Sequence, residues 1–403
     1  MKFVSLLVCA TLLFAQRKSV NVGQREVLTG LDVLVREHFA RLSGKHIGLI
    51  TNHTGLSMDG KRNVDLMLAA GVKVEALFSP EHGFMGVEDQ PNVADAVDAA
   101  THLHVYSLHA GPQHRITPEM LKNIDTLVFD IQDVGARFYT YSCTMIYGMQ
   151  EAARVHLPFY VLDRPNPITG THVEGPIIDP DLESYVGCAP VPIRHGFTFG
   201  ELAQFVNGER HRDADLHVVK MQGWKRSDWW DDTNLTWVDP SPNMNSLPEA
   251  ILYPGTCLLE RVQNFSVGRG SRVPYEQIGA DWLDARRVSA FLNSRSIPGV
   301  RAYPTRFRPT AYHYANQTID GVRFVITDRN ALNSVQLGLE LIYALQQLYP
   351  GKIDIAANNH LIGSKSVISG LQAGTDPAAI EHSYSGALQN FLEKRKQYLL
   401  YSE

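Results

Sequence analysis

The stretch TLVFDIQDVGARFYTY, residues 126–141, decides the predicted fold of this chain. It opens with a short apolar run that ends in Asp130, and Gln132, Asp133 and Arg137 follow at once. Short apolar runs of this kind are typical of parallel strands that are buried on both faces. In an open α/β sheet, ligands bind beyond the carboxyl ends of the strands. The stretch therefore predicts a buried strand that delivers polar side chains to a ligand site.

Three other runs share this pattern of an apolar core followed by polar, mostly ionisable residues. They are HIGLITN (46–52), KVEALFSPEHG (73–83) and FYVLDRPNP (159–167). Helices are expected between the runs, over residues 64–70, 118–122, 143–156 and 198–207, and a further strand over 216–224. This alternation of strands and helices predicts an α/β fold, a Rossmann-like, mostly parallel sheet domain over residues 27–235.

The second half of the chain gives a different pattern. Residues 227–254 are rich in Asp, Asn, Pro and Trp and are expected to form a linker or a cleft-forming loop. A strand over 321–327 and helices over 334–348 and 379–402 follow. We therefore expect a C-terminal α+β auxiliary domain over residues 236–403.

Length and composition agree with two domains. The chain has 403 residues, and 44% of them are hydrophobic, which is ample for two cores. A net charge of −5 gives no electrostatic case for binding nucleic acid. Neither a GxGxxG fingerprint nor a Walker A sequence occurs, so no nucleotide cofactor is expected.

The N-terminal residues 1–15, MKFVSLLVCATLLFA, have the features of a secretory signal peptide: one Lys, an apolar core and a small residue at the end. The alternative is a buried first helix. We expect export, to the periplasm or outside the cell. No later segment reaches the roughly 18 apolar residues of a membrane span. Removal of the signal would leave three cysteines, and this odd number argues against a disulfide framework.

The dipeptide Glu81-His82, in SPEHGF, is the first candidate for chemistry. Pro80 ends the strand and Gly83 permits a sharp turn, so Glu81 should project into the crevice. A carboxyl that is partly enclosed by apolar neighbours is suited to general acid catalysis. The alternative is a glutamate that only caps a helix or forms a salt bridge.

A second candidate group comprises Gln132, Asp133, Arg137 and Tyr139. An acid, a guanidinium and a phenol on one strand-to-helix turn can hold a carboxylate, a phosphate or sugar hydroxyls. The alternative is an internal salt bridge between Asp133 and Arg137 that fixes the loop. A ligand-binding role and the internal salt bridge are compatible with each other.

Further candidates come from three other loops. Two prolines stiffen the loop that presents Arg164 and Asn166, although a rigid turn alone would have the same sequence. Asn52 ends the first apolar run. Arg269, in SVGRGS, could lie near an anionic ligand or in an ordinary hairpin turn.

Two other reaction classes have little support. The absence of a GxSxG elbow disfavours a serine hydrolase. His53, His82, Asp133 and His195 could together ligate a metal from scattered strand ends, but no HExxH or similar spacing supports this. We therefore assign no metal ligands.

Over nearly its whole length the chain resembles the exo-β-N-acetylmuramidase (NamZ, or YbbC-like) family of peptidoglycan-processing glycosidases. The matching stretches are GLITNHTG (48–55), ALFSPEHGF (76–84), DTLVFDIQDVGARFYTY (125–141), VLDRPNPITG (161–170), EGPIID (174–179), PIRHGFTFGELA (192–203), LYPGTCLLE (252–260) and SVGRGS (266–271). The weakest match is HVYSLHAGPQHRITPEML (104–121), where the family usually has a sequence closer to SLYG.

The resemblance implies an active site in the cleft between the two domains, no cofactor, and a muropeptide or disaccharide substrate. The implied reaction is release of terminal, non-reducing, β-linked N-acetylmuramic acid (MurNAc) from fragments such as MurNAc-GlcNAc. Glu81 is then the catalytic acid, with His82 beside it. The second catalytic group is open among Asp133, Glu174 and Glu201, and a substrate-assisted route is also open.

Substrate recognition follows from the same resemblance. MurNAc carries a lactyl carboxylate, which Arg137, Arg164 and Arg269 could bind. The other expected substrate contacts are Asn52, Gln132, Tyr139, Asn166 and Glu174. Loops over 84–103 and 227–254 could close the pocket at one end, which predicts exo action.

Two alternative functions remain at this stage. The same arginines would serve a protein that binds muropeptides without turnover, and a metal-dependent hydrolase of another bond is the other alternative. The sequence leaves the oligomeric state open.

Overall fold

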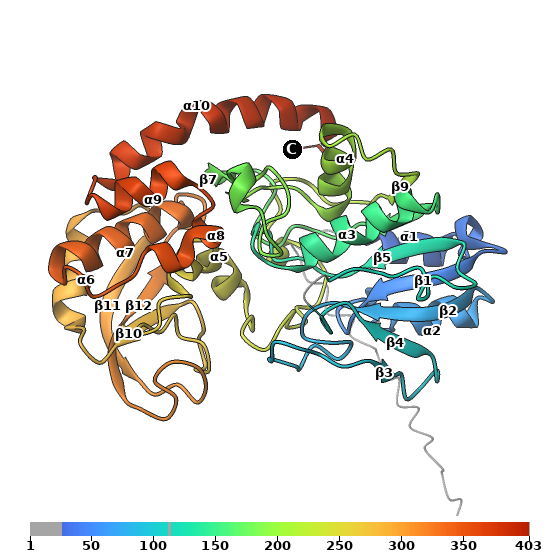
Figure 1. The fold of residues 1–403 in the computed structure, drawn as a ribbon, viewed down its shortest axis with the longest axis horizontal. Coiled ribbons are helices and arrows are strands. Elements are labelled where there is room, and N and C mark those ends of the chain that lie inside the picture. Colours follow the sequence, from blue (N-terminus) through green and yellow to red (C-terminus); the bar gives the residue numbers. More distant parts are fainter. Residues whose placement is uncertain (1–25, 112–113, 403) are drawn as a thin grey trace, which may run out of the picture.

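The computed structural model describes residues 26–111 and 114–402 of the chain. Figure 1 shows two parts side by side, each built around its own sheet, with the long helix α10 (Pro377–Arg395) arching over both. The signal peptide predicted over residues 1–15 lies outside the described residues.

The first part contains a seven-stranded sheet with the strand order β3-β4-β2-β1-β5-β6-β9. All neighbouring strands in this sheet are parallel except β3 and β4. The strands are β1 (His46–Thr51), β2 (Lys73–Ser79), β3 (Ala96–Val97), β4 (His104–Ser107), β5 (Thr126–Asp130), β6 (Phe159–Leu162) and β9 (Leu216–Val219). From β1 the chain first adds β2, β3 and β4 on one side of that strand, and it then adds β5, β6 and β9 on the other side. The predicted Rossmann-like, mostly parallel sheet is confirmed.

Helices cover both faces of this sheet. Leu127 and Phe129 of β5 belong to the core that also contains residues of helices α3 and α4, whereas Val128 belongs to the core formed with α1 and α2. The helices are α1 (Gly30–Arg36), α2 (Asn63–Ala69), α3 (Tyr141–Arg154) and α4 (Phe199–Glu209). Burial on both faces explains why these strands are apolar without alternation.

The second part contains a three-stranded antiparallel sheet with the order β10-β12-β11. Its elements are β10 (Gln277–Ala280), β11 (Val300–Phe307), β12 (Ile319–Ile326), α5 (Leu247–Thr256), α6 (Ala285–Ser294), α7 (Ser334–Leu348), α8 (Asn359–Ile362) and α9 (Lys365–Gln372). The predicted α+β composition of this part is confirmed, whereas the boundary between residues 235 and 236 stays a prediction.

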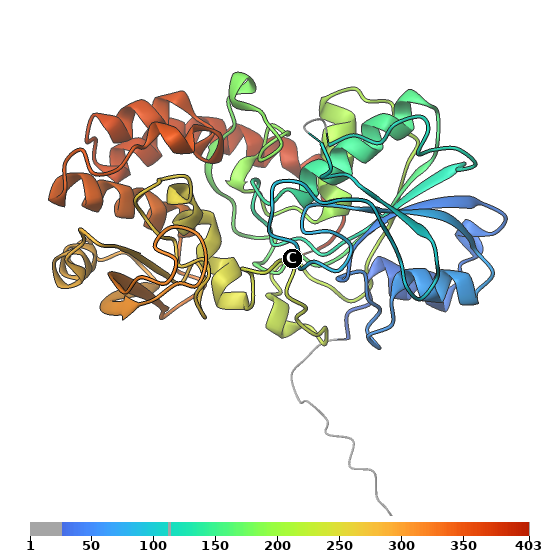
Figure 2. The same cartoon turned by 60° about the horizontal axis from the view of Figure 1, so that its bottom comes forward.

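The two parts share one hydrophobic core. Apolar residues of α3 and α4, such as Met145 and Phe205, belong to the same buried cluster as Leu252 of α5 and Leu341 of α7. A short two-stranded sheet, β7 (Glu174–Ile177) and β8 (Pro192–Arg194), lies between the parts. Figure 2 shows these central segments filling the space between the two sheets. Because the core is continuous, the interface can fix the geometry of a site built from both sides.

Two local predictions are wrong. Residues 118–122 form a turn instead of a helix; so short a segment has little helical stability of its own, and its conformation depends on tertiary contacts. Residues 227–254 are not all loop, since α5 begins at Leu247. The N-cap Ser246 accepts a hydrogen bond from the Glu249 amide, and Pro248 lies in the first turn, where a helix tolerates proline.

The expectation against disulfides is also wrong. Cys143, in α3, is bonded to Cys188, in the loop before β8. Cys257 is free and buried among the described residues. Of the three cysteines in the described residues, two form a disulfide and the third is a buried thiol.

Within residues 26–111 and 114–402, no helix has the length and apolar character needed to cross a membrane.

Candidate active site

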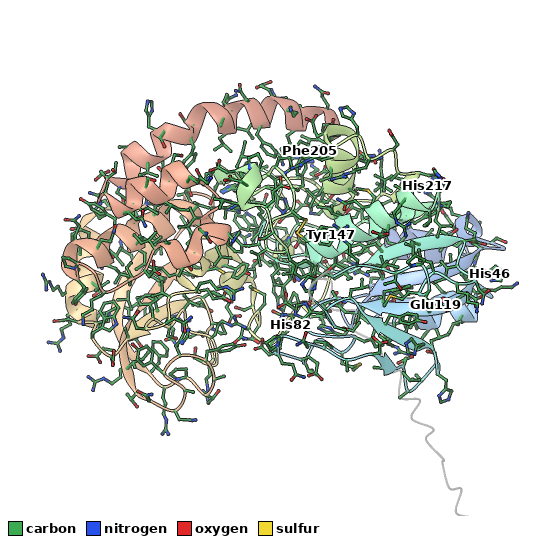
Figure 3. All side chains as sticks on the ribbon, in the orientation of Figure 1. His46, His82, Glu119, Tyr147, Phe205 and His217 are labelled. Carbon is green, nitrogen blue, oxygen red and sulfur yellow. A yellow bond between two sulfur atoms is a disulfide. The ribbon has the colours of Figure 1, made fainter. Side chains whose placement is uncertain are left out.

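The carboxyl ends of the parallel strands face the second part of the molecule. In Figure 3, His46 at the start of β1 lies at the outer edge, whereas His82, just after β2, lies on the side toward the second part. The crevice predicted at the strand ends is therefore covered by the C-terminal part.

A sharp turn after β2 carries Glu81. His82 and Gly83 both have φ in the left-handed region, 70° and 73°, and Gly83 can adopt this conformation without steric cost. The His82 imidazole holds the turn, because Nδ1 donates to the carbonyl of Glu88 at 2.6 Å. The turn predicted from Gly83 is present, and it directs Glu81 into a cavity.

This cavity has a volume of about 80 Å³ and is built from both parts of the molecule. From the first part come Glu81, His82, Phe138, Tyr139, Thr140 and Val186. The remaining lining residues are Ser241, Asn243, Met244, Tyr253, Cys257, Glu260, Arg261, Arg269, Tyr275 and Leu361. Two carboxylates, two guanidinium groups and several aromatic rings therefore share one small enclosure.

Glu81 is held in place but stays accessible. Its Oε2 accepts a hydrogen bond from Thr140 Oγ1 at 2.6 Å, and its Oε1 lies 3.9 Å from His109 Nε2. The side chain is 29% exposed. A substrate that enters the cavity can therefore reach this carboxyl.

Glu260 is the second carboxylate in the cavity, and the sequence analysis did not select it. Its Oε1 accepts from Arg269 at 2.5 Å, and its Oε2 accepts from the Tyr275 hydroxyl at 2.9 Å and from Cys257 Sγ at 3.1 Å. Burial by itself raises the pKa of Glu260, but Arg269 and these hydrogen bonds outweigh burial and lower it. Glu260 is therefore an anion at neutral pH. As the acid that ends the matched stretch 252–260, it could have been selected.

Arg269 links the two parts across the cavity. Besides Glu260, its guanidinium contacts Asp89 at 3.1 Å and lies over the ring of Tyr312 at 3.9 Å from the ring centre. Asp89 belongs to the loop over 84–103, which was expected to wall the pocket. The predicted role of Arg269 near an anionic ligand stays a prediction, and the sequence did not reveal its pairing with Glu260 and Asp89.

Arg261 also lines the cavity, and sequence analysis missed it. Among the described residues, no carboxylate lies within ion-pair distance of its guanidinium, although Glu260 is its neighbour in the chain. A second cavity of about 210 Å³ adjoins the first and shares Glu260, Arg261 and Arg269 with it. Arg261 is therefore the arginine at this site that is available to an anionic ligand.

The other two predicted arginines make internal contacts instead of lining this cavity. Arg137 is buried and donates to four backbone carbonyls, those of Pro176, Val191, Leu361 and Ile362. The alternative salt bridge between Arg137 and Asp133 is not formed either. Arg164 is bonded by two nitrogens to the buried Asp130, with a closest distance of 2.6 Å. Both guanidinium groups hold loops together.

Glu174 and Glu201 are likewise engaged away from the cavity. Glu174 pairs with the buried Arg194 at 2.5 Å. Glu201 accepts from the Thr198 amide in the capping box of α4 and pairs with Arg226. This geometry favours the capping and ion-pair functions for the two acids over their predicted catalytic or binding roles.

The three predicted amides also bond within the protein. Gln132 donates to the carbonyls of Asp133 and Pro165, and Asn166 donates to that of Phe197. The side chain of Asn52 accepts from Thr54. Among the residues described, none of these three lines the cavity with Glu81.

Tyr139, predicted as a substrate contact, lines the cavity, whereas Asp133 is buried outside it. Burial raises the pKa of Asp133 to about 7, and the nearby Val134 and Gly135 amides only partly oppose this. His195 Nε2 lies 3.9 Å from Asp133 Oδ2, and burial lowers the pKa of His195 to about 3. The two groups are therefore both neutral at pH 5 to 6.

The histidines considered as metal ligands do not converge. His53 Nε2 lies 2.8 Å from the carbonyl of Asp239, while His195 lies beside Asp133. Across residues 26–111 and 114–402, no group of three or more His, Cys, Asp or Glu side chains is arranged to hold a metal ion.

Comparison with known proteins gives the same family for both parts. The sequence model of the N-terminal region of exo-beta-N-acetylmuramidase NamZ matches residues 47–248, and that of its C-terminal region matches residues 251–401. The chain belongs to the NamZ family. This confirms the family resemblance found in the sequence.

Individual proteins of known sequence or structure are similar to this chain over almost its whole length. The peptidoglycan beta-N-acetylmuramidase NamZ of Bacillus subtilis (strain 168) is 42% identical over 389 residues, covering 95% of this chain and 94% of that protein. Two DUF1343 family proteins of Bacteroides fragilis NCTC 9343, BF0371 and BF0379, have similar crystal structures. Their TM-scores are 0.87 and 0.76 and their identities 34% and 30%, with 94% of this chain and 99% of each structure covered.

Proposed function

We propose that this protein is an exo-acting β-N-acetylmuramidase that releases terminal MurNAc from the non-reducing end of peptidoglycan fragments such as MurNAc-GlcNAc. Membership of the NamZ family makes it a glycosidase. The observation that carries the proposal is the presence of Glu81 and Glu260 in one cavity between the two parts. Most glycosidases act with two carboxyl groups that flank the scissile bond.

The two carboxyl groups differ as this chemistry requires. Glu81 is accessible and hydrogen-bonded by a neutral hydroxyl, which suits a proton donor to the leaving oxygen. Glu260 is kept anionic by Arg269, which suits stabilisation of positive charge at the anomeric carbon or activation of a nucleophile. Glu260 thus joins Asp133, Glu174 and Glu201 as a candidate for the second group, and it alone of the four lines the cavity with Glu81 among the described residues.

Arg261 is our candidate for recognition of the lactyl carboxylate. An arginine that forms no ion pair within the protein can form a charge-assisted pair with a substrate carboxylate. Tyr139, Tyr253 and Tyr275 line the same cavity and offer ring faces or edges to a sugar. We therefore expect a strong preference for MurNAc glycosides over GlcNAc glycosides.

The walls of the cavity support exo action. The contact between Asp89 and Arg269 connects the loop over 84–103 to the C-terminal part beside the cavity, because Arg269 is one of the lining residues. A small enclosure admits a chain end more readily than the middle of a polymer. Export, as predicted from residues 1–15, would bring the enzyme to its substrate and to the oxidising conditions in which a disulfide persists.

Product analysis over time tests this proposal. Digestion of MurNAc-terminated oligosaccharides should give free MurNAc from the earliest samples, and GlcNAc-terminated oligosaccharides should stay intact. Early digests that contain mainly disaccharides and longer fragments would refute exo action.

A matched pair of variants tests the recognition step. Arg261→Gln should lower kcat/KM for MurNAc glycosides by at least about tenfold, since a charge-assisted hydrogen bond contributes about 1.5–3 kcal/mol. Arg286→Gln, at an exposed position on α6, is the control and should leave it unchanged. Equal activity of both variants would eliminate Arg261 as the carboxylate-binding residue.

A further inference from the structure

His109 is a titratable side chain that lies beside Glu81 but does not line the cavity. It follows β4, is 10% exposed, and its Nε2 lies 3.9 Å from Glu81 Oε1. Since Thr140 occupies Oε2 of the same carboxyl, Oε1 is the oxygen that faces the imidazole. A small movement would join the two groups by a hydrogen bond.

A stack of rings fixes the position of His109. Its ring lies 4.9 Å from the ring of His114, and His114 lies 3.7 Å from Tyr185, nearly parallel to it. The Tyr185 hydroxyl lies 2.8 Å from Thr144 Oγ1 on α3. The loop that carries Tyr185 is also tied to α3 by the disulfide between Cys143 and Cys188. The N-terminal end of α3 therefore holds Glu81, through Thr140, and also holds the ring of Tyr185 that ends the stack.

The groups that face His109 determine its protonation. They are Glu81, His114, His82 and, at a greater ring distance, Tyr185. Burial lowers the pKa of His109, Glu81 raises it, and the other two histidines lower it, with a net decrease. Near neutral pH the imidazole is therefore neutral and able to accept a proton at Nε2.

We propose that His109 is a positioning residue: its neutral Nε2 accepts a hydrogen bond from the protonated Glu81 carboxyl and thereby favours the protonated acid that catalysis needs. The inference rests on the proposed function, because it concerns the acid of that reaction. It adds a group that works through Glu81 without contacting the sugar.

The proton balance of the reaction agrees with this function. Glu81 gives its proton to the leaving oxygen as the glycosidic bond breaks. The water that adds to the anomeric carbon releases one proton, and that proton returns to the pair formed by Glu81 and His109. One water is consumed, and the pair ends each cycle with the proton with which it began.

The pH profile of kcat/KM tests the proposal. A hydrogen bond that the protonated carboxyl donates stabilises the protonated form, so the proton is lost at a higher pH. His109→Gln should therefore shift the basic limb of the profile to lower pH by about half a pH unit. His104→Gln, at an exposed position on β4, is the matched control and should leave the profile unchanged. A basic limb that coincides in His109→Gln and the wild type would overturn the proposal.

A second measurement covers the case in which His109→Gln fails to fold. Nitrogen NMR can follow the titration of the His109 imidazole in wild-type protein and in Glu81→Gln. Removal of the neighbouring carboxylate should shift this titration to lower pH, and an unchanged titration would refute the coupling. This readout needs no turnover, so it tests the pair even if the wild-type protein releases no MurNAc, which would refute only the proposed function.

Discussion

Replacement of Asp133 by asparagine should stabilise the protein, and the gain should depend on pH. The folded state raises the pKa of Asp133 from 3.8 to about 7 through burial. Between these values the unfolded chain has lost the proton and the folded protein has kept it, so stability falls as pH rises through this range. A shift of about three units corresponds to roughly 4 kcal/mol, at 1.36 kcal/mol for each unit. Asparagine has the shape of the protonated acid and does not titrate.

Urea unfolding of Asp133→Asn and wild type, at several pH values, measures this difference. The free energy of unfolding of the variant relative to wild type should rise by about 4 kcal/mol from pH 4 to pH 7 and stay level above that. His195 is present in both proteins, so most of its own titration cancels. Asp59→Asn, at an exposed turn, is the matched control for loss of a single carboxylate. A difference for Asp133→Asn that stays constant from pH 4 to pH 7 would refute the reasoning.

Two further substitutions test other parts of the site. Glu260→Gln should lower kcat by at least about 100-fold, because it removes the negative charge opposite the acid, and steady-state kinetics of correctly folded protein would check this. A smaller loss than tenfold would exclude Glu260 as the second carboxylate. Replacing both Cys143 and Cys188 by serine should lower the free energy of unfolding by about 4 kcal/mol, the chain-entropy value for a separation of 45 residues. An unchanged urea midpoint would show that the disulfide contributes nothing to stability.

The strands of the sheet could be predicted from the sequence because each depends on a local pattern. β1, β2, β5 and β6 are short apolar runs buried on both faces, and their polar ends follow directly in the chain. The turn at Gly83 was predictable for the same reason, since it needs only a residue that tolerates positive φ. α7 has the expected bounds because its apolar face has helical spacing over 15 residues.

The composition of the cavity could not be predicted in this way. Arg137 and Arg164 have the residue types and positions expected of anion-binding groups, but backbone carbonyls and Asp130 satisfy them. Their partners lie 34 to 225 residues away, so the pairing depends on the tertiary fold. Glu260 and Arg261 reach the cavity only because the C-terminal part packs over the strand ends. The sequence therefore gives the location of the site better than it gives the residues that line it.

Glu81 is the proton donor on which the proposed reaction depends, and the dependence of the rate on the leaving group measures that role. Glu81→Gln should cleave MurNAc-GlcNAc about 10² to 10⁴ times more slowly than wild type. It should retain most of its activity toward a dinitrophenyl MurNAc glycoside, whose leaving group needs no proton. Glu88→Gln, a half-buried neighbour in the same loop, should behave as wild type on both substrates. If Glu81→Gln kept more than half of the wild-type rate on MurNAc-GlcNAc, or lost both activities equally while folded, Glu81 would not be the acid.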